Sequence, residues 1–310
     1  MDVSPIDQPL PDLPAWADYF CAANLPVLRH TVHELERLRE DAENINARVL
    51  ASVILNDPLM TLRVLAYIEA NRGKRQTTDI TTIERALMMI GINPFFQAFR
   101  ELPLVEDQLR THPKALIGLL KVCARARRAA HWAHEWAVLR HDLDVDEITV
   151  AALLHDFAEI LMWSFAPALA VRVRDTQVAN RSLRSVQVQA EIYGVALYEI
   201  KAELAARWRL PALLTLLMDS NHAENPRVRN VKLAVDLARH SANGWDDAAL
   251  PDDLRAIEDL IHIGHDHLLQ KLGLDPEQVP NLANPLPRVP VAVPEAPATP
   301  APPAAPAQPQ

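Results

Sequence analysis

Apolar residues recur every three or four positions along most of the chain, which is the spacing of helices that bury one face. The pattern is clear on both sides of the break Asn56-Asp57-Pro58, with apolar positions at Ile45, Val49, Val53 and Ile54 and then at Leu62, Leu65 and Ile68. Proline lacks a backbone donor and restricts the residue before it, so an undisturbed helix does not run through this break. We therefore expect two short helices joined by a turn.

Polar residues at fixed spacing predict where further helices begin and end. Thr81-Thr82-Ile83-Glu84 has the form of a capping box, in which the Thr81 hydroxyl accepts from the Glu84 amide and the Glu84 carboxylate accepts from the Thr81 amide. Gly91 is placed to end that helix. Asp144-Val145-Asp146-Glu147 opens a later helix in the same way, and that helix is expected to include Ile148–Leu161.

Composition supports an all-α fold. The 310 residues are 49% hydrophobic, enough for a sizeable core, yet include only 7 glycines, fewer than turn-rich sheets usually need. The net charge of -9 does not favour non-specific binding to nucleic acid or anionic membranes. Cys21 and Cys123 are too few for a disulfide framework, and the N-terminus has no signal-peptide pattern, so we expect a cytoplasmic protein.

The last part of the chain differs sharply from the rest. From Asp275 onward, 12 of the 25 prolines are mixed with alanine and valine and with very few charges. Proline at this density prevents a packed helix and favours an extended chain, so a disordered tail is expected over 275–310. The tail could serve as a spacer or as a ligand for a proline-binding partner.

Three stretches, in this order, resemble the HDOD family, the HD-related output domains of bacterial signalling proteins. The first begins at Leu25-Pro26 and continues through Val53–Leu65, with its Asp57-Pro58, to Ile83–Gly91. The second is Ala151–Asp156, with Leu-Leu-His-Asp, and the third is Glu203–Pro211, with Trp208 and a terminal Leu-Pro. The resemblance covers about 25 to 222, more weakly to about 236. The family's usual Asn-Ser after the second helix is missing, and this chain has Tyr-Ile-Glu nearby.

The resemblance implies a multi-helix HD-like bundle with a regulatory role. On this basis we divide the chain into an N-terminal extension (1–20), the HDOD domain (21–222), a C-terminal helical extension of the same domain (223–274) and the disordered tail (275–310). No receiver, cyclase or kinase domain is expected in the chain, so the input would come from another polypeptide or a small ligand.

The resemblance to HD hydrolases also identifies positions of a former metal site. Such enzymes hold one or two cations with His and Asp from several helices, and the cations activate water and neutralise phosphate. Alignment on the motifs gives six vestigial positions, which are Arg125, His155, Asp156, Leu197, His222 and Asp236. Arginine and leucine offer no ligand where the hydrolases have histidine. Ala158-Glu159 replaces a Gly-Lys pair, which would put negative charge where phosphate binds.

Other readings of these residues stay open. His155 could be a hydrogen-bonded core residue, and Asp156 could pair with Arg125. His131 and His134 are spaced so that they could chelate a metal, although Trp132 and Trp136 beside them indicate a half-buried amphipathic helix. A third group, His262, His265 and His267, is expected on a solvated helix face. The basic patch Lys121, Arg125, Arg127 and Arg128 is either a solvated helix face or engaged in internal salt bridges, or it is a docking surface for an acidic partner helix or a phosphorylated ligand.

We therefore predict a non-catalytic regulatory protein that acts through contacts with a signalling protein, without metal or other cofactor. One alternative is a metal-dependent HD phosphohydrolase acting on a nucleotide or cyclic dinucleotide, with His131 or His134 completing the site. A second is a non-catalytic nucleotide sensor that turns Arg125 toward phosphate. An Arg125–Asp156 ion pair would favour the non-catalytic regulator, and an open cavity would favour the nucleotide sensor. His131 or His134 beside His155 would favour the phosphohydrolase.

Overall fold

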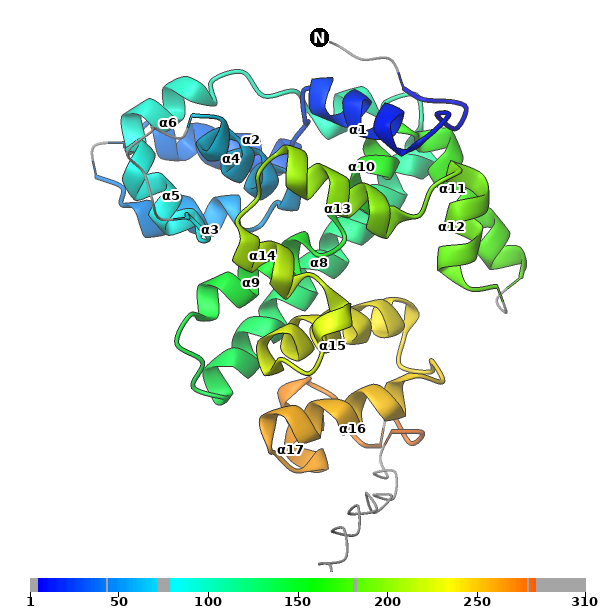
Figure 1. Cartoon of the computed structure of the whole chain (residues 1–310). Helices are drawn as coiled ribbons and strands as arrows, with labels where there is room; N and C mark the ends of the chain where they lie inside the picture. The colour runs from blue at the N-terminus through cyan, green and yellow to red at the C-terminus, as the bar shows by residue number, and fades with distance from the viewer. Residues whose placement is uncertain (1–4, 43, 72–78, 181–182, 278, 283–310) are drawn as a thin grey trace, which may run out of the picture.

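The computed structural model describes residues 5–42, 44–71, 79–180, 183–277 and 279–282 (Figure 1). Within these ranges the regular structure is helical, and the one β-type pairing is an isolated bridge between Val27 and Leu104. The prediction of an all-α fold is confirmed. Most of the predicted disordered tail, 283–310, lies outside the described residues.

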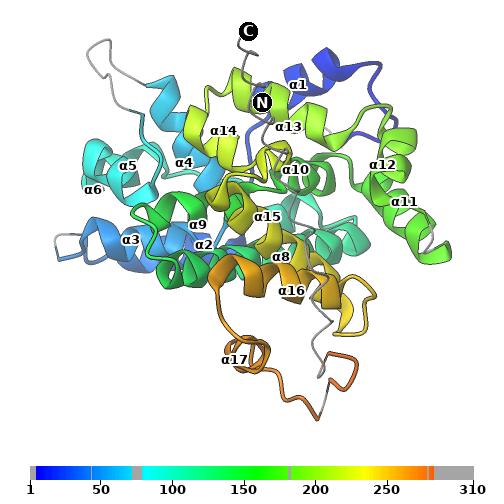
Figure 2. The same cartoon turned by 60° about the horizontal axis from the view of Figure 1, so that its bottom comes forward.

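The N-terminal third forms short helices, most of which lie together at one side of the molecule, whereas the first packs against the later helix Leu197–Arg207 (Figures 1 and 2). They are α1 (Leu13–Ala22), α2 (Arg29–Arg39), α3 (Ala47–Ile54), α4 (Pro58–Ala70), α5 (Ile83–Ile90), α6 (Ile92–Ala98) and α7 (Val105–Gln108). The predicted break is present between α3 and α4. There the buried Asp57 carboxylate accepts from the amides of Leu59 and Met60 at the start of α4, and from the Leu28 amide and Thr31 hydroxyl at the start of α2.

A long helix, α8 (Pro113–Leu139), runs through the centre and carries the helices that matter for the site (Figure 1). Packed on it are α9 (Val145–Leu154), α10 (Phe157–Phe165), α11 (Pro167–Ala179) and α15 (Pro226–His240). Gly118 allows close approach of α10, because a Cβ atom on it would lie 2.4 Å from the Trp163 ring. The remaining helices are α12 (Ser185–Tyr193), α13 (Leu197–Arg207), α14 (Ala212–Leu217), α16 (Leu250–Ile261) and α17 (His265–Lys271), with 3-10 turns η1 (Ser220–His222) and η2 (Ser241–Asn243).

The stretch Val145–Phe165, which comprises α9 and α10, is long and apolar enough by composition to cross a membrane, with a mean hydropathy of 1.4. In the structure 78% of its most apolar 18 residues are buried among the other helices. Its apolar character is therefore accounted for by its place in the core.

Two predicted caps have a different form in the structure. The N-cap of α5 is Thr82, whose hydroxyl accepts a hydrogen bond from the Arg85 amide. The Thr81 hydroxyl instead donates to the Glu147 carboxylate at the start of α9, with an oxygen–oxygen distance of 2.6 Å. Asp144 precedes α9 but makes no capping hydrogen bond through its side chain. The predicted register was therefore wrong by one residue for α5 and the capping box of α9 is absent, whereas Gly91 ends α5 with a φ of 84° as predicted.

Candidate functional site

The His-Asp pair lies in a turn between two helices. α9 ends at Leu154 and α10 begins at Phe157, so His155 and Asp156 connect them. The expectation of one continuous helix through this pair was wrong. The turn lies beside α8, against which both helices pack, and it faces Arg125 on that helix.

The guanidinium of Arg125 binds two carboxylates at once. Its Nη2 donates to Asp156 Oδ2 at 2.9 Å and to Glu159 Oε2 at 2.6 Å. The three side chains are only 15%, 20% and 24% exposed. The ion pair that was one of the readings for Asp156 is thus present, and Glu159, from the first turn of α10, completes it.

His155 completes this group, which we call the Arg125 cluster (Arg125, His155, Asp156 and Glu159). Its Nδ1 lies 2.8 Å from Asp156 Oδ1, so each carboxylate oxygen of Asp156 has a partner. Burial alone raises the pKa of Asp156, but Arg125 and His155 outweigh burial and hold this pKa well below its usual value. Asp156 is therefore ionised. The buried Nε2 of His155 has no hydrogen-bond partner among the described residues.

Lys201 on α13 adds a second positive charge near Asp156. Its Nζ donates to the Met218 carbonyl at 3.0 Å. Burial lowers the pKa of this lysine, while Asp156 and Asp219 act in the opposite direction. No sequence motif pointed to Lys201. Lys201 lies one helical turn after Leu197. Because the motif alignment pointed only to the apolar Leu197, it did not reveal the lysine that follows.

The other vestigial positions do not join the Arg125 cluster through a contact. Leu197 packs against the apolar core. His222 is half exposed and pairs with Asp219 at 3.1 Å. Asp236 pairs with Lys232 at 2.5 Å and with Arg239. Across the part of the chain that the structure describes, no group of three His, Cys, Asp or Glu side chains is placed to hold a metal ion.

The remaining histidines have separate roles. His134 Nδ1 lies 3.2 Å from the Thr149 hydroxyl, and His131 faces a surface groove, so neither contacts His155. The prediction of a solvated face was wrong for His265, which is largely buried and lies 2.6 Å from both Glu258 and the Leu282 carbonyl. His262, with a φ of 55°, ends α16.

The basic patch predicted on α8 divides between two sides of that helix. Arg125 turns inward to the carboxylates. Lys121, Arg127 and Arg128 line a groove of 570 Å³, completed by Ala124, His131, Ala242 and Asn243, and we call it the basic groove. Its lining residues include no carboxylate. Arg128 also lies 6.0 Å from the centre of the Trp132 ring, which orients its guanidinium.

The model of the HDOD domain matches residues 25–224, nearly two thirds of the chain. The chain belongs to the HDOD family. Its fold is similar to the MmoQ response regulator of Methylococcus capsulatus, with a TM-score of 0.58, 14% identity and coverage of 85% of this chain and 99% of the other. It is also similar to a Campylobacter jejuni virulence factor, with a TM-score of 0.61, 18% identity and coverage of 87% and 94%. None of the curated proteins matches the chain.

The HD hydrolases that the His-Asp motif resembles hold their cations with His and Asp side chains. Metal ligands must offer a lone pair, which a guanidinium does not have. Arg125 bonds to the same Asp156 that would be a ligand, and its positive charge would repel a cation there. The residues of the Arg125 cluster do not fit a metal ion.

Proposed function

We propose that this HDOD protein is a non-catalytic regulator that acts in signalling through contacts with other proteins. HDOD membership and the fold shared with a response regulator support a signalling role. The observation that carries the non-catalytic part is the Arg125 guanidinium bound to Asp156 and Glu159. A permanently charged side chain supplies there the positive charge that a hydrolase takes from its metal.

The same observation bears on the two alternatives. A hydrolase would need a new set of ligands, but His134 lies beside the Thr149 hydroxyl and His131 lines the basic groove, so neither contacts His155. A nucleotide sensor in the old pocket would need Arg125 free for phosphate, but two carboxylates already bind its Nη2. Both alternatives would require the Arg125 cluster to open at the cost of leaving buried carboxylates unpaired.

Elemental analysis for Fe, Mn and Zn on protein without a His tag tests this proposal. We expect no stoichiometric metal in the wild type or in H155A and D156A variants, and no phosphodiesterase activity on a cyclic dinucleotide with added Mn²⁺. Near-stoichiometric metal that both substitutions remove would overturn the proposal. Binding of the cyclic dinucleotide without hydrolysis, lost on Arg125→Met, would instead identify a sensor.

We further propose that the basic groove receives an acidic segment of the signalling partner. The groove is lined by three cationic side chains and by no carboxylate, so it is a local region of positive charge on a protein whose net charge is -9. Such a region attracts a negatively charged segment of a partner. Titration of the protein with a synthetic Glu/Leu helix tests this proposal. We expect K121S and R127S each to weaken binding of that helix at low salt. Unchanged binding by both variants would contradict it.

A further inference from the structure

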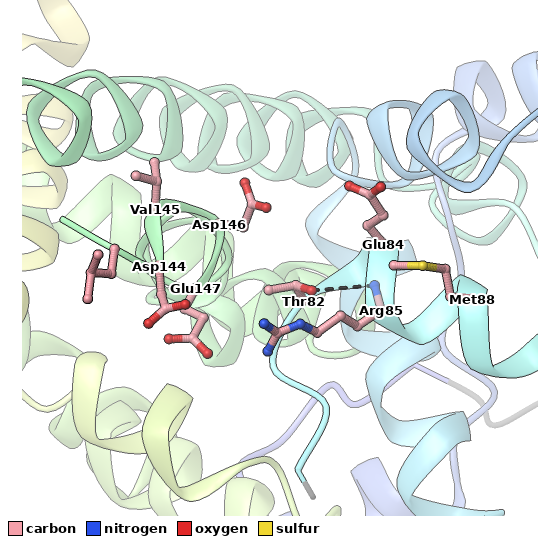
Figure 3. Close-up of a pocket in the computed structure, with 9 residues that line it drawn as sticks. Thr82, Glu84, Arg85, Met88, Asp144, Val145, Asp146 and Glu147 are labelled. Atoms are coloured by element: carbon pink, nitrogen blue, oxygen red, sulfur yellow. Dashed lines mark hydrogen bonds between the residues drawn. The ribbon is translucent and has the colours of Figure 1, made fainter. Parts of the chain in front are cut away.

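A second surface lies between α5 and the start of α9, in a groove of 380 Å³. We call it the α5–α9 groove; its lining residues are Thr82, Glu84, Arg85, Met88, Leu143, Asp144, Val145, Asp146 and Glu147. Figure 3 shows the side chains of α5 facing those of α9 across Thr82. No residue of this groove is shared with the Arg125 cluster or the basic groove.

Two of the lining residues are apolar and open to solvent. Leu143 is 98% exposed and Met88 is 63% exposed. Isolated exposed apolar residues are common, but here two of them lie in one hollow. Methionine adapts its shape to different partners, and leucine can insert into an opposing apolar surface. These residues supply the apolar contact that a partner would bury.

The rim of the groove is acidic. Glu84, Asp144 and Asp146 are in no ion pair among the described residues, and Glu147 at the base is held by Thr81 and Arg227. Acidic residues at a helix start are stabilised by the helix dipole, so these charges alone would indicate no ligand. Combined with Leu143 and Met88, they give the groove both exposed apolar side chains and unpaired negative charge.

We propose that the α5–α9 groove binds a cationic amphipathic helix of a partner protein, with leucine-like side chains on Leu143 and Met88 and Lys or Arg opposite the acidic rim. Charge complementarity selects this occupant. An acidic helix would be repelled by the three unpaired carboxylates, and an uncharged apolar helix would bury them without a partner. The proposal extends the proposed function by adding a contact site of opposite charge to the basic groove. A single regulator can then bind two partners of different charge.

The fold supports a preformed site. Glu147 bonds to Thr81 before α5 and to Arg227 at the start of α15, which fixes the two walls of the groove relative to each other. In Figure 3 the Arg85 side chain extends from α5 toward the side on which Asp144 and Glu147 lie. A cationic partner would therefore meet unbalanced negative charge chiefly at Glu84 and Asp146. A rigid site loses less entropy on binding.

The test uses the full chain, with methionine methyl groups labelled for NMR, and a synthetic helix of about four turns with Leu on one face and Lys on the other. The chain has six methionines, of which Met60, Met162 and Met218 are buried references. We expect the peptide to shift the Met88 methyl signal and to leave the buried references unchanged. A peptide of the same charge with Ser in place of Leu should bind about tenfold more weakly.

Matched variants separate this site from non-specific attraction. Leu143→Ser should weaken binding of the Leu/Lys peptide about tenfold, whereas V178S, at a residue 69% exposed on α11, should leave it unchanged. D144N with D146N should weaken binding and reduce its salt dependence. Equal effects of L143S and V178S, or no shift at Met88, would overturn the proposal.

Two other occupants would also be revealed. Self-association of the protein that Leu143→Ser abolishes would assign the groove to a second copy and overturn the proposal. Tighter peptide binding after joint substitution of Arg72, Lys74 and Arg75 by Ser would mean that a basic segment of the same chain competes for it, and would likewise overturn it. Because no groove variant touches the Arg125 cluster, failure here leaves the metal and activity results unaffected.

Discussion

Replacing Arg125 with methionine is expected to destabilise the protein strongly, because it leaves two buried carboxylates without their cation. Asp156 and Glu159 are about one fifth to one quarter exposed and bond to Arg125 at 2.9 and 2.6 Å. Removing one partner from a mostly buried ion pair costs about 3–5 kcal/mol. Since both carboxylates lose the same partner, we expect the free energy of unfolding of R125M to be about 4 kcal/mol lower than that of the wild type at neutral pH.

The effect should depend on pH in a defined direction. The pKa of Asp156 in the folded protein is depressed, so its contribution to stability is present above the unfolded-state pKa and is lost as pH falls through the folded-state pKa. In R125M the buried Asp156 carboxylate lacks its cation, which favours its protonation, so the variant gains relative stability on acidification. The difference between wild type and R125M should therefore narrow from about pH 7 to about pH 4.

Urea unfolding followed by circular dichroism measures both effects. The exposed Arg174–Asp175 pair provides the control, since R174M should lose at most about 1 kcal/mol. The triple variant of R125M with D156N and E159Q should recover most of the loss, because it leaves no unpaired charge. If R125M unfolds at the same urea concentration as R174M, or if the triple variant is less stable than R125M, the structural role assigned to Arg125 is refuted.

Two further substitutions test the packing around the site. Gly118→Ala should lower the free energy of unfolding by about 1–3 kcal/mol, because the added Cβ would overlap the Trp163 ring, although alanine usually stabilises a helix interior. The control is G264A, which has open space around it and should change thermal stability little. Hydrogen bonding to Asp253 raises the pKa of His240, so the stability lost in H240A should be greatest below the usual histidine pKa and should decrease as pH rises through the raised pKa. A loss for H240A that grows from about pH 6 to about pH 9 would contradict the assigned pairing.

Local patterns predicted the parts of the fold that local chemistry determines. The break at Asp57-Pro58 and the end of α5 at Gly91 follow from backbone properties of proline and glycine, and both are present. The cap of α5 was predicted one residue early because Thr81 and Thr82 are equally good caps locally. Glu147, distant in sequence, binds the Thr81 hydroxyl and leaves Thr82 as the cap.

The candidate site was predictable as far as the motifs reached. Alignment to the HDOD pattern identified Arg125 and Asp156, and the charges suggested that they could pair. The turn at His155 was not foreseen, because the residues around it are compatible with a continuous helix. Lys201 was missed because its position near Asp156 depends on how α13 packs, which no local spacing encodes.

The Arg125 cluster explains how the bundle can keep Asp156 in its interior without a metal. An ionised carboxylate in this position needs a positive charge nearby, since its burial without one costs several kcal/mol. Arginine stays charged at all pH values at which the fold exists, and its planar group can serve two carboxylates. The chain itself thus supplies the positive charge that Asp156 needs. A return to metal binding would require replacing Arg125 and also removing the second carboxylate that now relies on it, so a single substitution such as R125H should not create a metal site.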